Sequence, residues 1–183
     1  MAHRFLAFPD TVNEYAARVT AGLIVLLTLA TLLTEGLIHL VLLSLLAVGF
    51  ALRVAGGPRY SPLGRLSVHV LVPLLRRPPL PTAGAPKRFA QAIGLACSTT
   101  ALLLTLAGWH TAATVVLVIL AAAATLESVF GFCLGCRLFG MLMRIGVIPE
   151  DVCLECADVG SRYTATGTVS PEIAQVDVGV RVR

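Results

Sequence analysis

Four of the chain's five cysteines form two pairs with the same spacing, Cys133–Cys136 and Cys153–Cys156. In a C-x-x-C pair the thiols can approach closely enough to form an exchangeable disulfide, and a lowered thiol pKa supplies the thiolate nucleophile. One interpretation is therefore redox or sulfur-transfer chemistry, and it makes the chain a candidate membrane thiol-disulfide oxidoreductase. In this interpretation Cys133 and Cys136 are the active pair, while Cys153 and Cys156 pass redox equivalents to or from a partner.

The place of the first pair relative to its helix decides whether a thiolate is favoured there. A helix N-terminus stabilises negative charge, whereas Cys133 follows the C-terminal end of an apolar segment. Gly131 and Gly135 can break that helix and allow a new one to begin at Arg137. Such a break would restore the favourable geometry and would place a cation next to the pair.

A four-cysteine zinc site is the alternative interpretation. Sixteen residues separate Cys136 from Cys153, which falls within the spacing of structural zinc sites with Cys133 and Cys156 as the outer ligands. The chain would then be a non-enzymatic scaffold or interaction protein, and zinc is the one cofactor that the sequence suggests. The fifth cysteine, Cys97, stands alone in an apolar segment, as small buried cysteines often do.

Glu127 is the acidic residue closest to the first pair and lies about two turns before it. A carboxylate at this depth costs a few kcal/mol in a membrane unless it is paired, protonated or facing a wet cavity. Two roles remain open, as a proton donor or acceptor for the thiols and as a member of a structural ion pair. The candidate partners at matching depth are Arg18, Arg53, Arg88 and Gln91.

Composition places these residues in a membrane protein. Hydrophobic residues make up 57% of the chain and charged residues only 13%, against about 25% charged in soluble domains. Four segments, 16–34, 37–55, 88–107 and 111–132, reach the roughly 20 apolar residues that a membrane-spanning helix needs. The net charge of +4 is spread without a dense basic run, which argues against nucleic-acid binding.

The loops predict how the four spans are arranged. Very short turns at 35–36 and 108–110 favour an up-down bundle, so the fold class is an all-α four-transmembrane-helix protein in a lipid bilayer. Lys and Arg gather in the N-terminus, in the connection between spans two and three, and in the tail, which predicts that both termini are cytoplasmic in the plasma (inner) membrane. Permanent disulfides are disfavoured in that compartment.

The connection and the tail have their own patterns. Residues 62–76, capped by Ser61, are too short to span and fit an interfacial amphipathic helix, and residues 78–86 read as a stiff linker. The membrane domain is predicted to cover 1–158, with the second cysteine pair in a cytoplasmic tail at 145–158. Residues 159–183 are predicted to form a polar, flexible tail.

The start of the first span carries two further expectations. Asn13 is suited to cap the helix through its side-chain oxygen. Glu14 and Arg18 are spaced i,i+4, which predicts a surface ion pair.

Several short motifs together carry a family resemblance. They lie at 8–14, 58–62, 86–91 (PKRFAQ), 126–127, 131–136 (GFCLGC) and 146–149 (GVIP), leading into Cys153 and Cys156. Over residues 8–158 the chain resembles the bacterial membrane family known as domain of unknown function 4395. The resemblance implies a four-span membrane domain with a cysteine pair at the end of the last helix. It also implies association with thioredoxin-like or rhodanese-like proteins.

Overall fold

Four long helices dominate the computed structural model, which describes residues 11–57, 60–74 and 80–148. They are α1 (Glu14–Leu32), α2 (Gly36–Gly56), α5 (Gly84–Leu106) and α6 (His110–Phe130). Each is long and apolar enough to cross a membrane. Their ends agree to within four residues with the spans that hydropathy predicts.

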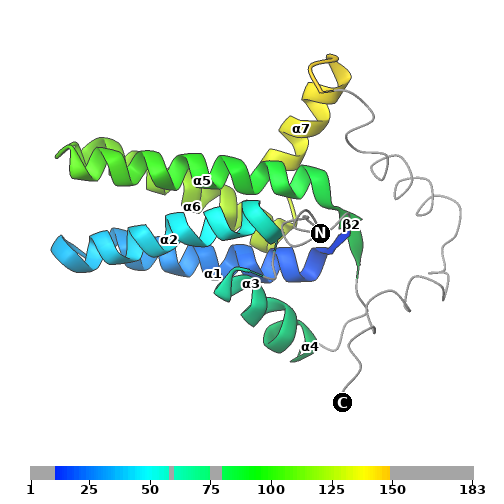
Figure 1. Cartoon of the computed structure of the whole chain (residues 1–183), viewed down its shortest axis with the longest axis horizontal. Coiled ribbons are helices and arrows are strands. Elements are labelled where there is room, and N and C mark those ends of the chain that lie inside the picture. Colours follow the sequence, from blue (N-terminus) through cyan, green and yellow to red (C-terminus); the bar gives the residue numbers. More distant parts are fainter. Residues whose placement is uncertain (1–10, 58–59, 75–79, 149–183) are drawn as a thin grey trace, which may run out of the picture.

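The four helices lie side by side as a bundle (Figure 1). Helix α1 packs on α2 and α6, and α5 packs on the same two helices. Apolar residues from all four fill the core, while many large apolar side chains such as Leu37, Val48 and Leu103 remain exposed on the outside. A soluble protein rarely exposes so much apolar surface, whereas lipid accommodates it. The core cluster comprises Ile24, Leu43, Leu46, Phe50, Ala101, Leu117, Leu120 and Ala124.

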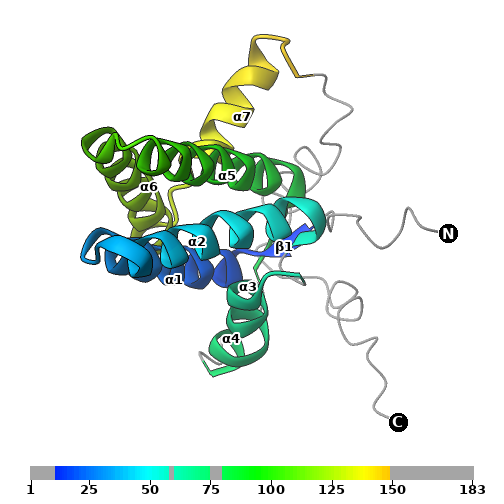
Figure 2. The same cartoon turned by 60° about the vertical axis from the view of Figure 1, so that its left-hand side comes forward.

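A short helical segment follows α2, contacts α1 and projects away from the bundle (Figures 1 and 2). It consists of α3 (Pro62–Leu66), a π-helical turn η3 (Ser67–Leu71) and α4 (Val72–Leu74). The Ser61 side chain caps it by accepting a hydrogen bond from the Gly64 amide at 3.4 Å. Its position is that of the predicted helix 62–76, of which 75 and 76 lie outside the described residues.

Two short strands depart from the all-helical expectation. Strand β1 (Thr11–Asn13) pairs antiparallel with β2 (Pro81–Ala83), so that Asn13 lies opposite Pro81. The described part of the predicted stiff linker, 80–86, therefore holds a strand and the first turn of α5. Helix α5 begins four residues before the predicted start because Pro86 is tolerated in a first turn, where its missing N–H breaks no helical hydrogen bond. The strand pair ties the starts of α1 and α5 together.

A further helix, α7 (Leu134–Arg144), leaves the bundle at the same end as the strands (Figure 1). It packs on α5, with the rings of Phe139 and Phe89 5.6 Å apart between centroids. A Cβ atom added at Gly135 would lie 2.6 Å from the Cα atom of Ala90, so α7 approaches α5 at a point where only glycine fits. This close crossing holds the first turn of α7 against the start of α5.

Candidate functional site

The chain breaks between α6 and α7 immediately before the first cysteine pair. Gly131 adopts φ +68°, a left-handed conformation that glycine adopts without steric cost, and its amide donates to the Glu127 carbonyl. Cys133 then takes an extended conformation as the N-cap of α7, which begins at Leu134. The predicted break is confirmed, although the new helix begins three residues before Arg137.

The two thiols of the pair are in direct contact. The Cys136 thiol donates a hydrogen bond to Cys133 Sγ at 2.8 Å between sulfurs, and the Cys136 amide donates to the same sulfur at 3.4 Å. The thiol hydrogen bond from Cys136 is the largest influence that lowers the pKa of Cys133, assisted by nearby Lys87. The same hydrogen bond and burial raise the pKa of Cys136. Cys133 is therefore the thiol that ionises first, at a helix N-terminus that favours negative charge.

A buried lysine links three helices beside this pair. Lys87 on α5 is only 5% exposed, and its Nζ lies 2.8 Å from Glu127 Oε1 on α6 and 3.0 Å from Glu14 Oε2 on α1. Lys87 was not among the predicted partners of Glu127, because its position in the sequence placed it with the charges of the connection between spans two and three. The predicted pair of Glu14 with Arg18 was also wrong, since Glu14 turns to Lys87.

The other predicted partners of Glu127 have different roles. Arg18 caps the C-terminal end of α6, donating from Nε to the Ser128 carbonyl at 3.2 Å and from Nη2 to the Val129 carbonyl at 2.6 Å. These carbonyls carry the negative end of the helix dipole, which a cation stabilises. Arg88 donates from Nε to the Val54 carbonyl at the end of α2. Asn13 caps α1 as predicted, accepting from the Tyr15 amide at 3.0 Å.

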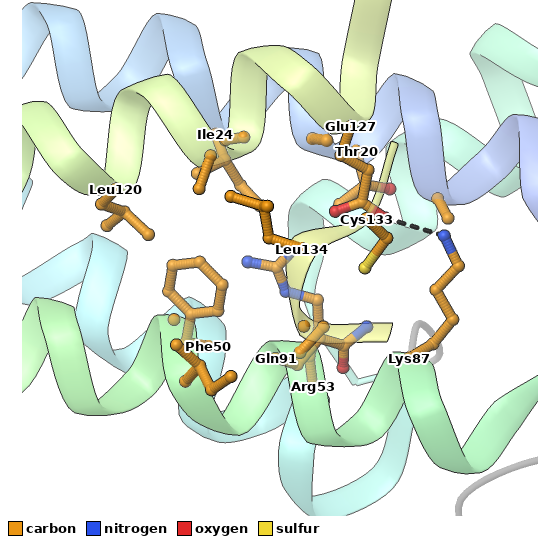
Figure 3. Close-up of a pocket in the computed structure, with 18 of the residues that line it drawn as sticks. Thr20, Ile24, Phe50, Arg53, Lys87, Gln91, Leu120, Glu127, Cys133 and Leu134 are labelled. Atoms are coloured by element: carbon orange, nitrogen blue, oxygen red, sulfur yellow. Dashed lines mark hydrogen bonds and ion pairs between the residues drawn. The ribbon is translucent and has the colours of Figure 1, made fainter. Parts of the chain in front are cut away.

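The remaining candidates, Arg53 and Gln91, line a cavity of about 420 Å³ between the four long helices. Arg53 is 2% exposed, and its Nε donates to the Gly49 carbonyl while its guanidinium stacks on the Phe50 ring. Within the described part of the chain, Arg53 Nη2 and Gln91 Oε1 have no hydrogen-bond partner. Figure 3 shows both side chains reaching toward Cys133 from the opposite wall. The deeper end is apolar and is formed by residues including Ile24, Phe50 and Leu120.

A second hollow lies on the other side of the cysteine pair. It measures about 330 Å³ and is lined by residues that include Glu14, Thr82, Lys87, Cys136 and Arg137. Cys133 lines both spaces, whereas Cys136 lines only this outer hollow. The pair thus forms part of the wall between an outer hollow with charged walls and a mostly apolar inner cavity.

The second cysteine pair, Cys153 and Cys156, lies outside the described residues. Among the residues that are described, no group of three or more metal-binding side chains comes together. Cys97 is a half-buried free cysteine that lines the inner cavity. The site that the structure brings together is therefore Cys133, Cys136, Glu127 and the unforeseen Lys87.

A comparison with protein families shows which family the chain matches. The family model described as a domain of unknown function, DUF4395, matches residues 12–144. The chain belongs to this family. The match confirms the resemblance seen in the sequence, and the DUF4395 region contains all four long helices, the first cysteine pair and the Lys87 ion pairs. No curated protein and no solved structure matches the chain.

Proposed function

We propose that this DUF4395 domain is a membrane thiol–disulfide exchange protein with Cys133 as nucleophile and Cys136 as resolving thiol. The observation that carries the proposal is the hydrogen bond from the Cys136 thiol to Cys133 Sγ at the first turn of α7. It stabilises one thiolate and keeps the second sulfur within bonding reach. Either thiol alone would be an ordinary cysteine.

The exchange follows from the two pKa directions. The Cys133 thiolate attacks one sulfur of a partner disulfide, an S–S bond forms between Cys133 and the partner, and the other partner sulfur leaves as a thiolate. Cys136 then loses its proton and attacks Cys133 Sγ, which releases the second partner thiolate. The partner is reduced and the Cys133–Cys136 pair is oxidised; the reverse sequence reduces the pair. Glu127 is a carboxylate placed to assist the Cys136 proton, since its charge acts on both thiols.

We assign the cysteine end of the bundle to the cytoplasmic side of the plasma (inner) membrane. Arg53, Arg65, Lys87, Arg88 and Arg137 all belong to elements that meet at this end, while the two tight turns at the opposite end contain neither Lys nor Arg. Short loops rich in Lys and Arg stay in the cytoplasm. The partner would then be a cytoplasmic thioredoxin-like or rhodanese-like protein, with Cys153 and Cys156 passing equivalents between it and the first pair.

Mixed-disulfide trapping tests this assignment. Two variants of the full chain, Cys133→Ser and Cys136→Ser, are prepared in a background that carries Cys97→Ala, Cys153→Ser and Cys156→Ser. Each is purified in detergent and incubated with oxidised glutathione. The variant that keeps Cys133 should form the mixed disulfide faster, and the unsubstituted pair should release glutathione and close its own disulfide. Equal trapping by both variants would refute the assignment of the nucleophile, and no trapping by either would refute the function.

Zinc binding is the second candidate, and the spacing of the four cysteines favours it. The test is the zinc content of protein purified without chelator under reducing conditions. One zinc per chain, lost in Cys153→Ser/Cys156→Ser together with thermal stability, would replace the exchange function. A zinc-free protein whose double variant melts normally would support exchange.

A further inference from the structure

The inner cavity has the wrong chemistry to be a simple packing defect. Empty cavities in proteins are lined by apolar groups, whereas this one contains a buried guanidinium nitrogen and an amide oxygen without protein partners among the described residues. Buried polar atoms are nearly always satisfied by protein, water or a ligand. Arg53 Nη2 can donate a hydrogen bond to a bound group, and Gln91 Oε1 can accept one from it.

Charge balance argues that the missing group is neutral. The side chains of Arg53, Lys87, Glu14 and Glu127 carry two positive and two negative charges, and Lys87 already contacts both carboxylates. Ionisation of Cys133 adds a negative charge to the same wall. An anionic ligand would meet this thiolate and Glu127, while a neutral carbonyl oxygen would satisfy Arg53 without further charge.

The deeper part of the cavity selects for hydrocarbon. Ile24, Phe50 and Leu120 surround it, and the volume of about 420 Å³ lies in the range of small-molecule sites. The site therefore fits a neutral molecule with an oxygen-bearing head toward Arg53 and an apolar remainder. Cys133 lines this cavity as well as the outer hollow, so it can meet that molecule and a partner protein in turn.

We propose that the inner cavity binds a lipid-soluble quinone and that the quinone oxidises the Cys133–Cys136 pair. This inference rests on the proposed exchange function and names its electron acceptor. The quinone carbonyl oxygen accepts from Arg53 Nη2, and a hydroxyl of the reduced quinol donates to Gln91 Oε1, so the two redox states use both unpartnered atoms. A partner dithiol would reach the pair through the outer hollow, and its electrons would leave through the inner cavity.

The reaction balances with one proton from solvent. The Cys133 thiolate and the Cys136 thiol form an S–S bond and give up two electrons. The quinone takes those two electrons, the proton that leaves Cys136, and a second proton from water, and becomes the quinol. One disulfide and one quinol are produced for each pair oxidised.

Binding is tested separately from chemistry. The full chain carrying Cys133→Ser and Cys136→Ser is titrated in detergent with ubiquinone-1 by calorimetry. We expect saturable binding of one quinone per chain. Ala123→Leu, which fills the cavity wall from α6, should weaken binding at least tenfold, whereas Ala122→Leu, on the exposed face of the same helix, should leave it unchanged. Absence of saturable binding, or equal binding by both leucine variants, would overturn the proposal.

Oxidation is tested in protein whose only cysteines are Cys133 and Cys136. The reduced protein is mixed anaerobically with ubiquinone-1, and free thiols are counted by maleimide labelling while quinol is followed by absorbance. Two thiols should be lost for each quinol formed. The same preparation is exposed to oxidised glutathione without quinone. Exchange with glutathione but not with quinone overturns the quinone proposal and leaves the exchange function intact, and reaction with neither overturns both.

Discussion

The contacts of Lys87 predict that its removal destabilises the whole bundle. The perturbation is Lys87→Met, which keeps an unbranched side chain of similar length but removes the charge. Glu14 and Glu127 are then left without the cation that both carboxylates contact. Both are mostly buried, with side-chain exposures of 18% and 21%, so water screens them only in part.

The size of the effect follows from the two distances. At 2.8 and 3.0 Å, and with an effective dielectric constant of about 20, each pair contributes roughly 5 to 6 kcal/mol of attraction before desolvation is subtracted. Desolvation of three charged groups offsets much of this attraction. Removing one member of a buried pair costs about 3–5 kcal/mol in practice, because the remaining charge is left uncompensated. We expect a loss of about that size in the free energy of unfolding.

The assay is SDS-induced unfolding in mixed micelles, followed by circular dichroism. Arg88→Met is the matched control, since Arg88 is the next residue on α5 but is exposed. The double variant Lys87→Met/Glu127→Gln should be more stable than Lys87→Met alone, because one uncompensated carboxylate is gone. Unfolding of Lys87→Met at the same SDS content as Arg88→Met would refute this prediction. So would a double variant that is no more stable than Lys87→Met.

Three further predictions concern the joint between α6 and α7. In Cys136→Ser, which keeps a hydroxyl donor, the pH midpoint for alkylation of Cys133 by iodoacetamide should lie below that in Cys136→Ala, because losing the hydrogen bond lets the pKa of Cys133 rise; equal midpoints would contradict this. Gly131→Ala should destabilise the protein by about 1–2 kcal/mol in SDS titration, because an alanine resists φ +68°, whereas the control Gly140→Ala on open helix surface should gain up to about 1 kcal/mol. Gly135→Ala should cost about 1–3 kcal/mol in the same titration, because its new Cβ meets the α5 backbone; normal stability would mean that the crossing is looser.

Hydropathy was sufficient to predict the membrane helices, because each span satisfies a local rule of length and apolar composition. The same is true of the caps at Asn13 and Ser61, which depend on residues two or three positions away. The break before Cys133 was also visible, since Gly131 is one of few residues that can end a helix in a left-handed conformation.

The contacts of the site could not be predicted in the same way, because they join distant parts of the chain. Lys87 and Glu127 are 40 residues apart, and nothing local distinguishes Lys87 from its neighbour Arg88. Lys87 is buried and Arg88 is exposed, which depends on how α5 is rotated against the neighbouring helices. The strand pairing of Asn13 with Pro81 ties the starts of α1 and α5 together, and strands of three residues leave almost no periodic signal.

The ion pairs of Lys87 also divide unevenly between the two halves of the bundle, with consequences for assembly. The hairpin of α5 and α6 contains both Lys87 and Glu127, so it can neutralise its own charges as soon as its helices meet. The hairpin of α1 and α2 brings Glu14, which contacts Lys87 only when the halves associate. Glu14 is therefore the member of this ion-pair cluster that joins the α1–α2 hairpin to the α5–α6 hairpin. A second copy of the α5–α6 hairpin in place of the α1–α2 hairpin would lack Glu14, so this second ion pair of Lys87 would be lost.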